Sequence, residues 1–390
     1  MFRDRIIILM AVGQTLVWAG LFYVFPALLL EWEADTGWRR AELAGAITLA
    51  VLLSGAAAPL TGRIIDRGFG PQLMGGSAVT GGLALAALSG VDALWQFYAL
   101  WAVIGLACAG SLYEPCFVLV TRARGVRAKQ GIVAITLFAG FAGTVSFPLN
   151  HALAAALGWR GAVLAVGLFV AAVVAPMLGH AARALEAERR AREVPAAPAG
   201  AATAPGLLTR PAFWALGLAM GCIALVHSGT LQHLLPILDE AGVAAERAVL
   251  VASFIGPMQV AGRLAMIWSE RFLSHHGVAL AGFAALAIAE LALMASGAAP
   301  MLVAVFVLFF GGAVGTASIL RPLLAREILG EEDFGAKSGA LAVMFFSATA
   351  AAPYGGALIW ARGGYDAMLA TGAGVAVLGA ALYLLARRGA

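Results

Sequence analysis

The feature that most constrains this chain is a series of long apolar stretches that recurs from one end to the other. A membrane-spanning helix needs about 20 consecutive, mainly apolar residues. Twelve windows of that kind lie near residues 6–30, 41–62, 72–90, 95–120, 130–157, 160–180, 211–236, 247–268, 278–297, 300–325, 338–360 and 366–387. The sequence therefore predicts an all-α membrane protein with twelve transmembrane helices.

Composition agrees with a chain that is surrounded by lipid. Hydrophobic residues make up 62% and charged residues 12% of the 390 residues, whereas soluble domains are about 25% charged. The net charge of +4 comes from basic residues spread over short loops, so no nucleic-acid partner is expected. The 3 cysteines lie in apolar stretches without CxxC spacing, so neither a disulfide framework nor a metal or cofactor site is expected.

One long polar interval divides the chain. We expect an N-terminal six-helix bundle over residues 1–180, a cytoplasmic linker over 181–210 and a C-terminal six-helix bundle over 211–390. Placing both termini in the cytoplasm puts most of the basic loop residues on the inner side, as the positive-inside rule requires. Basic residues are nearly all arginine, with only Lys129 and Lys337 as lysines. This usage indicates a GC-rich bacterial genome and hence the bacterial inner membrane.

The two halves repeat one another. "AKQGIVAI" at 128–135 matches "AKSGALAV" at 336–343, and "LGWRGAVLAVG" near residue 160 matches "GGYDAMLATG" near residue 365. Matching halves with the same orientation predict parallel repeats that are related by a pseudo-two-fold axis along the membrane normal.

A charge within an apolar span is costly and indicates function. "SLYEP" in the fourth span and "SILRP" in the tenth place Glu114 and Arg321 directly before a proline, at matching points of the repeat. Each proline removes a backbone donor and favours a kink. The pair is interpreted either as a salt bridge that closes the cytoplasmic side or as a substrate- or proton-binding couple. Glu290, in the ninth span, is expected to be a structural partner of a neighbouring helix.

The loop "GRIIDRGFGP" at residues 62–71, together with the duplicated twelve spans, resembles the major facilitator superfamily of secondary transporters. The stretches "FYVFP", "GWRRAELAGAITL", "LQHLLPILDEAG" and "VAGRLAMIWSERF" look like its monocarboxylate and oxalate–formate porter branch. The resemblance implies alternating-access transport without covalent chemistry, so no enzyme activity. It also implies that the helices of Glu114 and Arg321 face each other across a central cavity.

The same resemblance assigns roles to further residues. Arg263 corresponds to the arginine that binds the substrate carboxylate, with a snorkelling boundary arginine as the alternative, and Gln259 lies one turn earlier on the same face. Other polar or aromatic residues expected at the substrate or proton site are Gln14, Trp18, Tyr113, Asn150 and His227. The loops after the second and eighth spans are expected to form a conformational latch, or simply to carry positive-inside charge, with Gly62, Asp66, Arg67, Glu270 and Arg271.

These features together predict a secondary active transporter that moves a small organic anion, a monocarboxylate first of all, with or against protons. The alternative is an efflux pump for drugs, metabolites or metalloids. A sensor or receptor on the same fold would need a signalling extension, which the sequence lacks. The expected partners are a small-molecule substrate, protons and the lipid bilayer, and the protein is expected to be a monomer.

Overall fold

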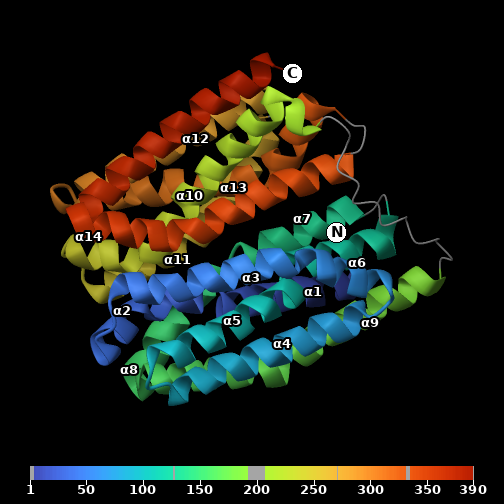
Figure 1. The fold of residues 1–390 in the computed structure, drawn as a ribbon, viewed down its shortest axis with the longest axis horizontal. Helices are drawn as coiled ribbons and strands as arrows, with labels where there is room; N and C mark the ends of the chain where they lie inside the picture. The colour runs from blue at the N-terminus through green and yellow to red at the C-terminus, as the bar shows by residue number, and fades with distance from the viewer. Residues whose placement is uncertain (1–3, 126–127, 192–206, 270, 331–333, 390) are drawn as a thin grey trace. The chain divides into compact units, whose positions relative to one another are not determined.

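The computed structural model describes residues 4–125, 128–191, 207–269, 271–330 and 334–389, and all regular secondary structure in those ranges is helical. Figure 1 shows the helices of each part of the chain as a bundle. The first part holds α1 (Arg5–Leu21), α2 (Val24–Thr36), α3 (Arg40–Asp66), α4 (Gly70–Ala87), α5 (Leu94–Ser111), α6 (Tyr113–Arg124), α7 (Ala128–Ala139), α8 (Ala142–Phe169) and α9 (Ala175–Ala191). The second holds α10 (Pro211–Glu240), α11 (Ala245–Ser269), α12 (His275–Met294), α13 (Leu302–Leu329) and α14 (Phe334–Arg388).

The described residues contain 10 helical stretches that are long and apolar enough to cross a membrane. Two of them, Gln130–Ala191 and Gly339–Arg388, have 62 and 50 residues, enough for two spans each. Each is broken by glycine: Gly158 in α8 has φ 68°, and Gly364 in α14 has φ 69°. Dividing both stretches at these glycines gives the twelve spans that the sequence predicts. Both breaks carry glycine because glycine adopts a positive φ without steric cost.

The chain forms two compact units, Met1–Ala199 and Gly200–Ala390. Helix α9 continues the sixth span through the charged stretch up to Ala191, so the first part of the expected linker is helical. Glu186 in this extension is 5% exposed and bonds to Arg189 and Arg190, one turn further on. The second part of the expected linker, residues 192–206, lies outside the described residues.

Both units repeat the same internal packing, which agrees with the duplication read from the sequence. The second span packs against the fourth, as α3 on α5 and as α11 on α13. The third packs against the fourth, as α4 on α5 and as α12 on α13. The first span packs against the fifth in each unit, as α1 on α7 and as α10 on α14. The third packs against the sixth, as α4 on α9 and as α12 on α14.

Glycine permits the closest of these contacts. A Cβ at Gly105 of α5 would overlap the backbone of Ala50 in α3, and a Cβ at Gly315 of α13 would overlap the carbonyl oxygen of Gln259 in α11. Both contacts join the second span to the fourth. In lipid, helices associate through such close packing of small residues rather than through the hydrophobic effect. The backbone approach at these glycines therefore fixes the spacing of α3 and α5 and that of α11 and α13, and α11 carries Gln259 and Arg263.

The contact at Gly315 predicts a stability difference within one helix. Gly315→Ala should destabilise the protein by about 1–3 kcal/mol, because the methyl group overpacks the interface with α11. Gly312→Ala, one turn earlier in α13, is the matched control, since nothing lies within 4 Å of a Cβ at that position. Thermal unfolding in detergent should show a lower midpoint for the first variant alone. Equal midpoints for the two variants would contradict the close approach of α11 and α13.

Candidate functional site

The fourth span breaks just before Glu114. Helix α5 ends at Ser111, α6 begins at Tyr113, and Leu112 between them is extended, with φ −84° and ψ −153°. Pro115 has no backbone N–H, so the carbonyl of Ser111, four residues earlier, has no helical donor. The Nε2 atom of Gln14 in α1 donates to that carbonyl at 2.9 Å. A side chain of the first span thus satisfies the backbone group that the proline leaves open.

In the second unit, a side chain of the first span also donates to the carbonyl that a proline leaves without a helical donor. Pro353 of α14 lies inside the eleventh span, and the carbonyl four residues earlier belongs to Thr349. The hydroxyl of Ser228 in α10, the first span of that unit, donates to this carbonyl at 2.9 Å. At the repeat mate of Glu114, in contrast, α13 runs from Leu302 to Leu329 without a break at Arg321.

Aromatic side chains surround the break in the first unit. The ring of Trp18 lies 4.8 Å from that of Tyr113, and Tyr113 stacks on Phe117 at 5.0 Å. Glu114 is exposed on the same short helix, while Gln14 is fully buried. Among the described residues, no hydrogen bond reaches Oε1 of Gln14 or Nε1 of Trp18. The structure therefore brings four of the predicted site residues together, with Gln14 acting first as a backbone cap.

Asn150 forms its hydrogen bonds within α8. It is 1% exposed, and its Nδ2 atom donates to the carbonyl and the hydroxyl of Ser146, at 2.8 and 3.0 Å. The Ser146 hydroxyl in turn donates to the carbonyl of Ala19 at 2.8 Å. That carbonyl lies where the first span is interrupted, since α1 ends at Leu21 and α2 begins at Val24. Asn150 and Ser146 thus hold α8 against the interrupted first span.

The second unit holds Arg263 and Arg321, the two arginines expected at the site, in different ways. Arg263 of α11 is 6% exposed, and its Nε atom donates to the carbonyl of Gly315 in α13 at 3.3 Å. Gln259 lies one turn earlier in α11 and is equally buried. The guanidinium of Arg321 lies over the ring of Phe345 in α14, 4.6 Å from its centroid, which is a cation–π contact. Phe345 was not among the predicted residues, because a phenylalanine in an apolar span gives no sequence signal.

His227 lies in the middle of α10, as predicted. Its ring lies 5.8 Å from that of Phe310 in α13, and among the described residues no hydrogen bond reaches its buried Nε2 atom. A buried imidazole nitrogen without a partner costs about 1–3 kcal/mol of stability. This atom is therefore a polar group to which a bound molecule or water can add a hydrogen bond.

The loop after the second span is joined to the end of the fourth span by an ion pair. Asp66, at the end of α3, forms an ion pair with Arg122 of α6 at 3.0 Å, and Arg122 also donates to the carbonyl of Ile65 at 2.7 Å. Arg67 is exposed. A Cβ at Gly62 would meet nothing within 4 Å, so packing in this structure does not require a glycine there. Arg122, which sequence reasoning did not single out, is the partner that gives Asp66 its role.

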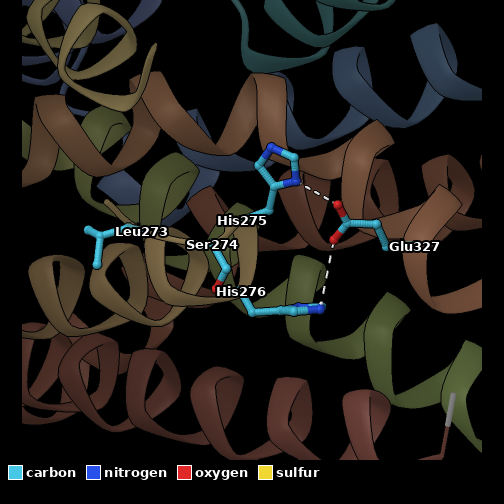
Figure 2. A pocket seen from close by; sticks show the side chains of 5 residues that line it. All are labelled: Leu273, Ser274, His275, His276 and Glu327. Carbon is cyan, nitrogen blue, oxygen red and sulfur yellow. Dashed lines mark hydrogen bonds and ion pairs between the residues drawn. The ribbon is translucent and has the colours of Figure 1, made fainter. Parts of the chain in front are cut away.

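In the corresponding loop of the second unit, the described contacts involve residues that the sequence did not single out. Arg271 is exposed, and Glu270 lies outside the described residues. At the start of α12, His275 bonds through Nδ1 to Glu327 of α13, and Nε2 of His276 lies 3.8 Å from the other carboxylate oxygen (Figure 2). His276 also hydrogen-bonds with the hydroxyl of Tyr383. In this unit the acid thus lies on the fourth span, whereas the fourth span of the first unit carries the arginine.

The Gln14 cap predicts an energetic coupling that a double-mutant cycle measures. Gln14→Leu should cost about 1–3 kcal/mol, because it leaves the buried Ser111 carbonyl without a donor. In a Pro115→Ala background the alanine N–H can take over, so the same substitution should cost markedly less. Gln130→Leu, an exposed glutamine of α7, is the control and should cost equally little in both backgrounds. A cost of Gln14→Leu that Pro115→Ala leaves unchanged would refute the capping role.

Solved structures of other proteins share the fold of this chain. The fold is similar to that of a bacterial homolog of the human lysosomal transporter Spinster, with TM-score 0.71, 14% identity and coverage of 100% of this chain and 97% of that one. It is also similar to a D-xylose–proton symporter, with TM-score 0.74, 12% identity and coverage of 98% and 96%. It is similar as well to the nucleoside transporter NupG, with TM-score 0.70, 11% identity and coverage of 99% of this chain and 100% of that one. No curated protein sequence matches the chain.

A family model supplies the assignment. The model described as Major Facilitator Superfamily matches residues 10–274, which is more than half of the chain. The matched region includes the interrupted first span, the break before Glu114 and the loop with Asp66. Members of this family are transporters and not enzymes. The chain therefore belongs to the major facilitator superfamily and is a multi-span secondary transporter of a small molecule.

Proposed function

We propose that this transporter moves a small organic anion, a monocarboxylate first of all, together with protons across the bacterial inner membrane. In this proposal the protein is a monomer with both termini in the cytoplasm. The orientation is supported by the distribution of basic residues over the loops. The anionic substrate is supported by the two arginines that the second unit holds within apolar spans, Arg263 and Arg321.

The burial of Arg263 is the observation that carries the proposal. A guanidinium has five N–H donors and cannot lose its charge in a protein. At 6% exposure it lies away from water, where its charge is costly unless acceptors surround it, and the carbonyl of Gly315 is one of them. A carboxylate offers two oxygens in the geometry that a guanidinium binds in bidentate fashion. Gln259, one turn earlier, can donate from its amide to the same ligand.

The aromatic cluster of the first unit favours a second candidate, an exporter of organic cations. Trp18, Tyr113 and Phe117 form an aromatic cluster at the short helix that also carries Glu114. Aromatic faces attract cations, and a nearby carboxylate adds to that attraction. A drug or metabolite with a positive charge would suit this arrangement. Transport of cationic drugs without transport of carboxylates would assign the protein to that class.

We also propose that the loop contacts act as latches. The Asp66–Arg122 pair ties the loop after the second span to the end of the fourth, and Gly62 and Arg67 flank it in the same motif. In the second unit His275 and His276 tie the loop that carries Arg271 to Glu327. Exposed ion pairs contribute about 0–1 kcal/mol each, which is enough to bias two states and weak enough to break in every cycle.

Removal of the buried arginine charge should abolish carboxylate transport. Purified protein in liposomes is tested for uptake from a panel of carboxylates and a panel of cationic drugs. Arg263→Gln should lower carboxylate uptake at least about tenfold, because a charged hydrogen bond contributes about 1.5–3 kcal/mol. Arg247→Gln, an exposed arginine of the same helix, is the control and should transport normally. Uptake of carboxylates that Arg263→Gln leaves intact would refute the assignment.

The opposite charges at matching repeat positions predict functional coupling between Glu114 and Arg321. Each single reversal, Glu114→Arg or Arg321→Glu, should lower uptake by roughly tenfold or more, a factor that corresponds to about 1.4 kcal/mol. The double reversal should recover much of the activity if the charges act on one another during transport. A double reversal as inactive as each single one would instead assign the two charges to substrate binding.

A further inference from the structure

A carboxyl group is enclosed in the second unit at a position that the proposed substrate site does not use. Glu290 belongs to α12, inside the apolar span His275–Gly297, and is 1% exposed. The sequence around it, "AALAIAELALM", is otherwise apolar. A carboxyl at such a depth is kept in membrane proteins only where it is paired or where it handles protons or ions.

Three helices meet at this carboxyl. The hydroxyl of Thr230, from α10, lies 2.9 Å from Oε1 and 3.0 Å from Oε2 of Glu290. From the other side, α14 approaches with Gly372, where a Cβ would lie 2.8 Å from Oε2. A larger residue at 372 would displace the carboxyl, so the glycine leaves the room that the acid occupies. Among the described residues, the carboxyl group of Glu290 is thus enclosed by three helices and has one polar partner, Thr230.

The enclosure fits a neutral carboxylic acid. Among the described residues, Thr230 is the only hydrogen-bonding partner of Glu290, and no cationic side chain forms an ion pair with it. A hydroxyl has a single proton, which two carboxylate oxygens can at most share, so Thr230 alone satisfies a carboxylate poorly. A protonated acid can donate its own proton to the Thr230 oxygen, which leaves no buried charge to be balanced.

Other ligands fit the enclosure less well. Cations such as Mg²⁺ and Ca²⁺ need six or more oxygen ligands, whereas Glu290 and Thr230 supply three. The charged and titratable groups on the helices that pack around Glu290 do not pair with it in the described residues. They are Cys222, His227, His233, Asp239 and Glu240 of α10, Arg321, Arg326 and Glu327 of α13, and Lys337, Tyr354, Arg362, Tyr365, Asp366, Tyr383, Arg387 and Arg388 of α14, together with His275 and His276 of α12 itself. The ligand that suits the enclosure is a proton.

We propose that Glu290 is a proton-binding site, loaded and emptied once in each transport cycle. This inference rests on the proposed function in one respect, that a proton moves with the substrate. Because Thr230, Glu290 and Gly372 come from three different helices, a shift of α10 or α14 against α12 would admit water to the carboxyl. Water stabilises the carboxylate, so the proton leaves when the enclosure opens and returns before it closes.

Infrared spectroscopy tests the site without any substrate. Purified protein is titrated with pH while the C=O stretching band of protonated carboxylic acids is recorded. Above about pH 6, where exposed carboxyls are already ionised, the wild type should show a band that disappears as the pH rises, and Glu290→Gln should lack it. Glu246→Gln, an exposed glutamate of α11, is the matched control and should keep the band. If Glu290→Gln does not fold, Thr230→Val should shift the frequency of the band, and Thr230→Ser should not.

Transport then tests the coupling. In proteoliposomes, Glu290→Gln should lose accumulation driven by a pH gradient while it retains substrate exchange at equal pH. The proposal is overturned if the wild type shows no titrating band, if the band is present at every pH or survives in Glu290→Gln, or if that variant accumulates substrate normally. Absence of carboxylate transport in the wild type would refute the proposed substrate, while the infrared titration would still decide on the proton site.

Discussion

The requirement that every backbone polar group in lipid has a partner shapes this protein more than any other constraint. Prolines in the spans remove donors, and an unsatisfied carbonyl in the hydrocarbon region costs several kcal/mol. The cap from Gln14 to the Ser111 carbonyl meets this cost at the break before Glu114, and Ser228 meets it at Pro353. In both units the donor comes from the first span, so that span is fixed by a polar contact to the span that carries the proline.

The caps and the glycine contacts together position the functional side chains. Gln14 orders the segment that presents Tyr113 and Glu114, and the close approach at Gly315 places Arg263 against α13. Neither contact involves a substrate. Both contacts set the positions of charged side chains within their unit. A transporter needs those charges in defined places, because a charge in lipid is costly.

Much of the candidate site follows from residue type alone. A charge or amide in an apolar span stands out, so Glu114, Arg263, Arg321, Gln14 and Asn150 could be found without a structure. Their roles could not, because a role depends on which partner the fold supplies. Gln14 and Asn150 bond to backbone carbonyls or to Ser146 rather than standing free. Phe345, Arg122 and Glu327 become important only through their contacts with Arg321, Asp66 and two histidines.

The sequence by itself determined the twelve spans, the internal duplication and the family, because hydropathy and repeated motifs are local properties that need no knowledge of contacts. The tertiary structure alone decided which carbonyl each buried amide satisfies, which ring lies under Arg321, and that Thr230 and Gly372 enclose Glu290. These pairings join residues far apart in the chain. No local pattern encodes such partners, since they depend on helix rotation and depth, which the packing of each whole unit sets.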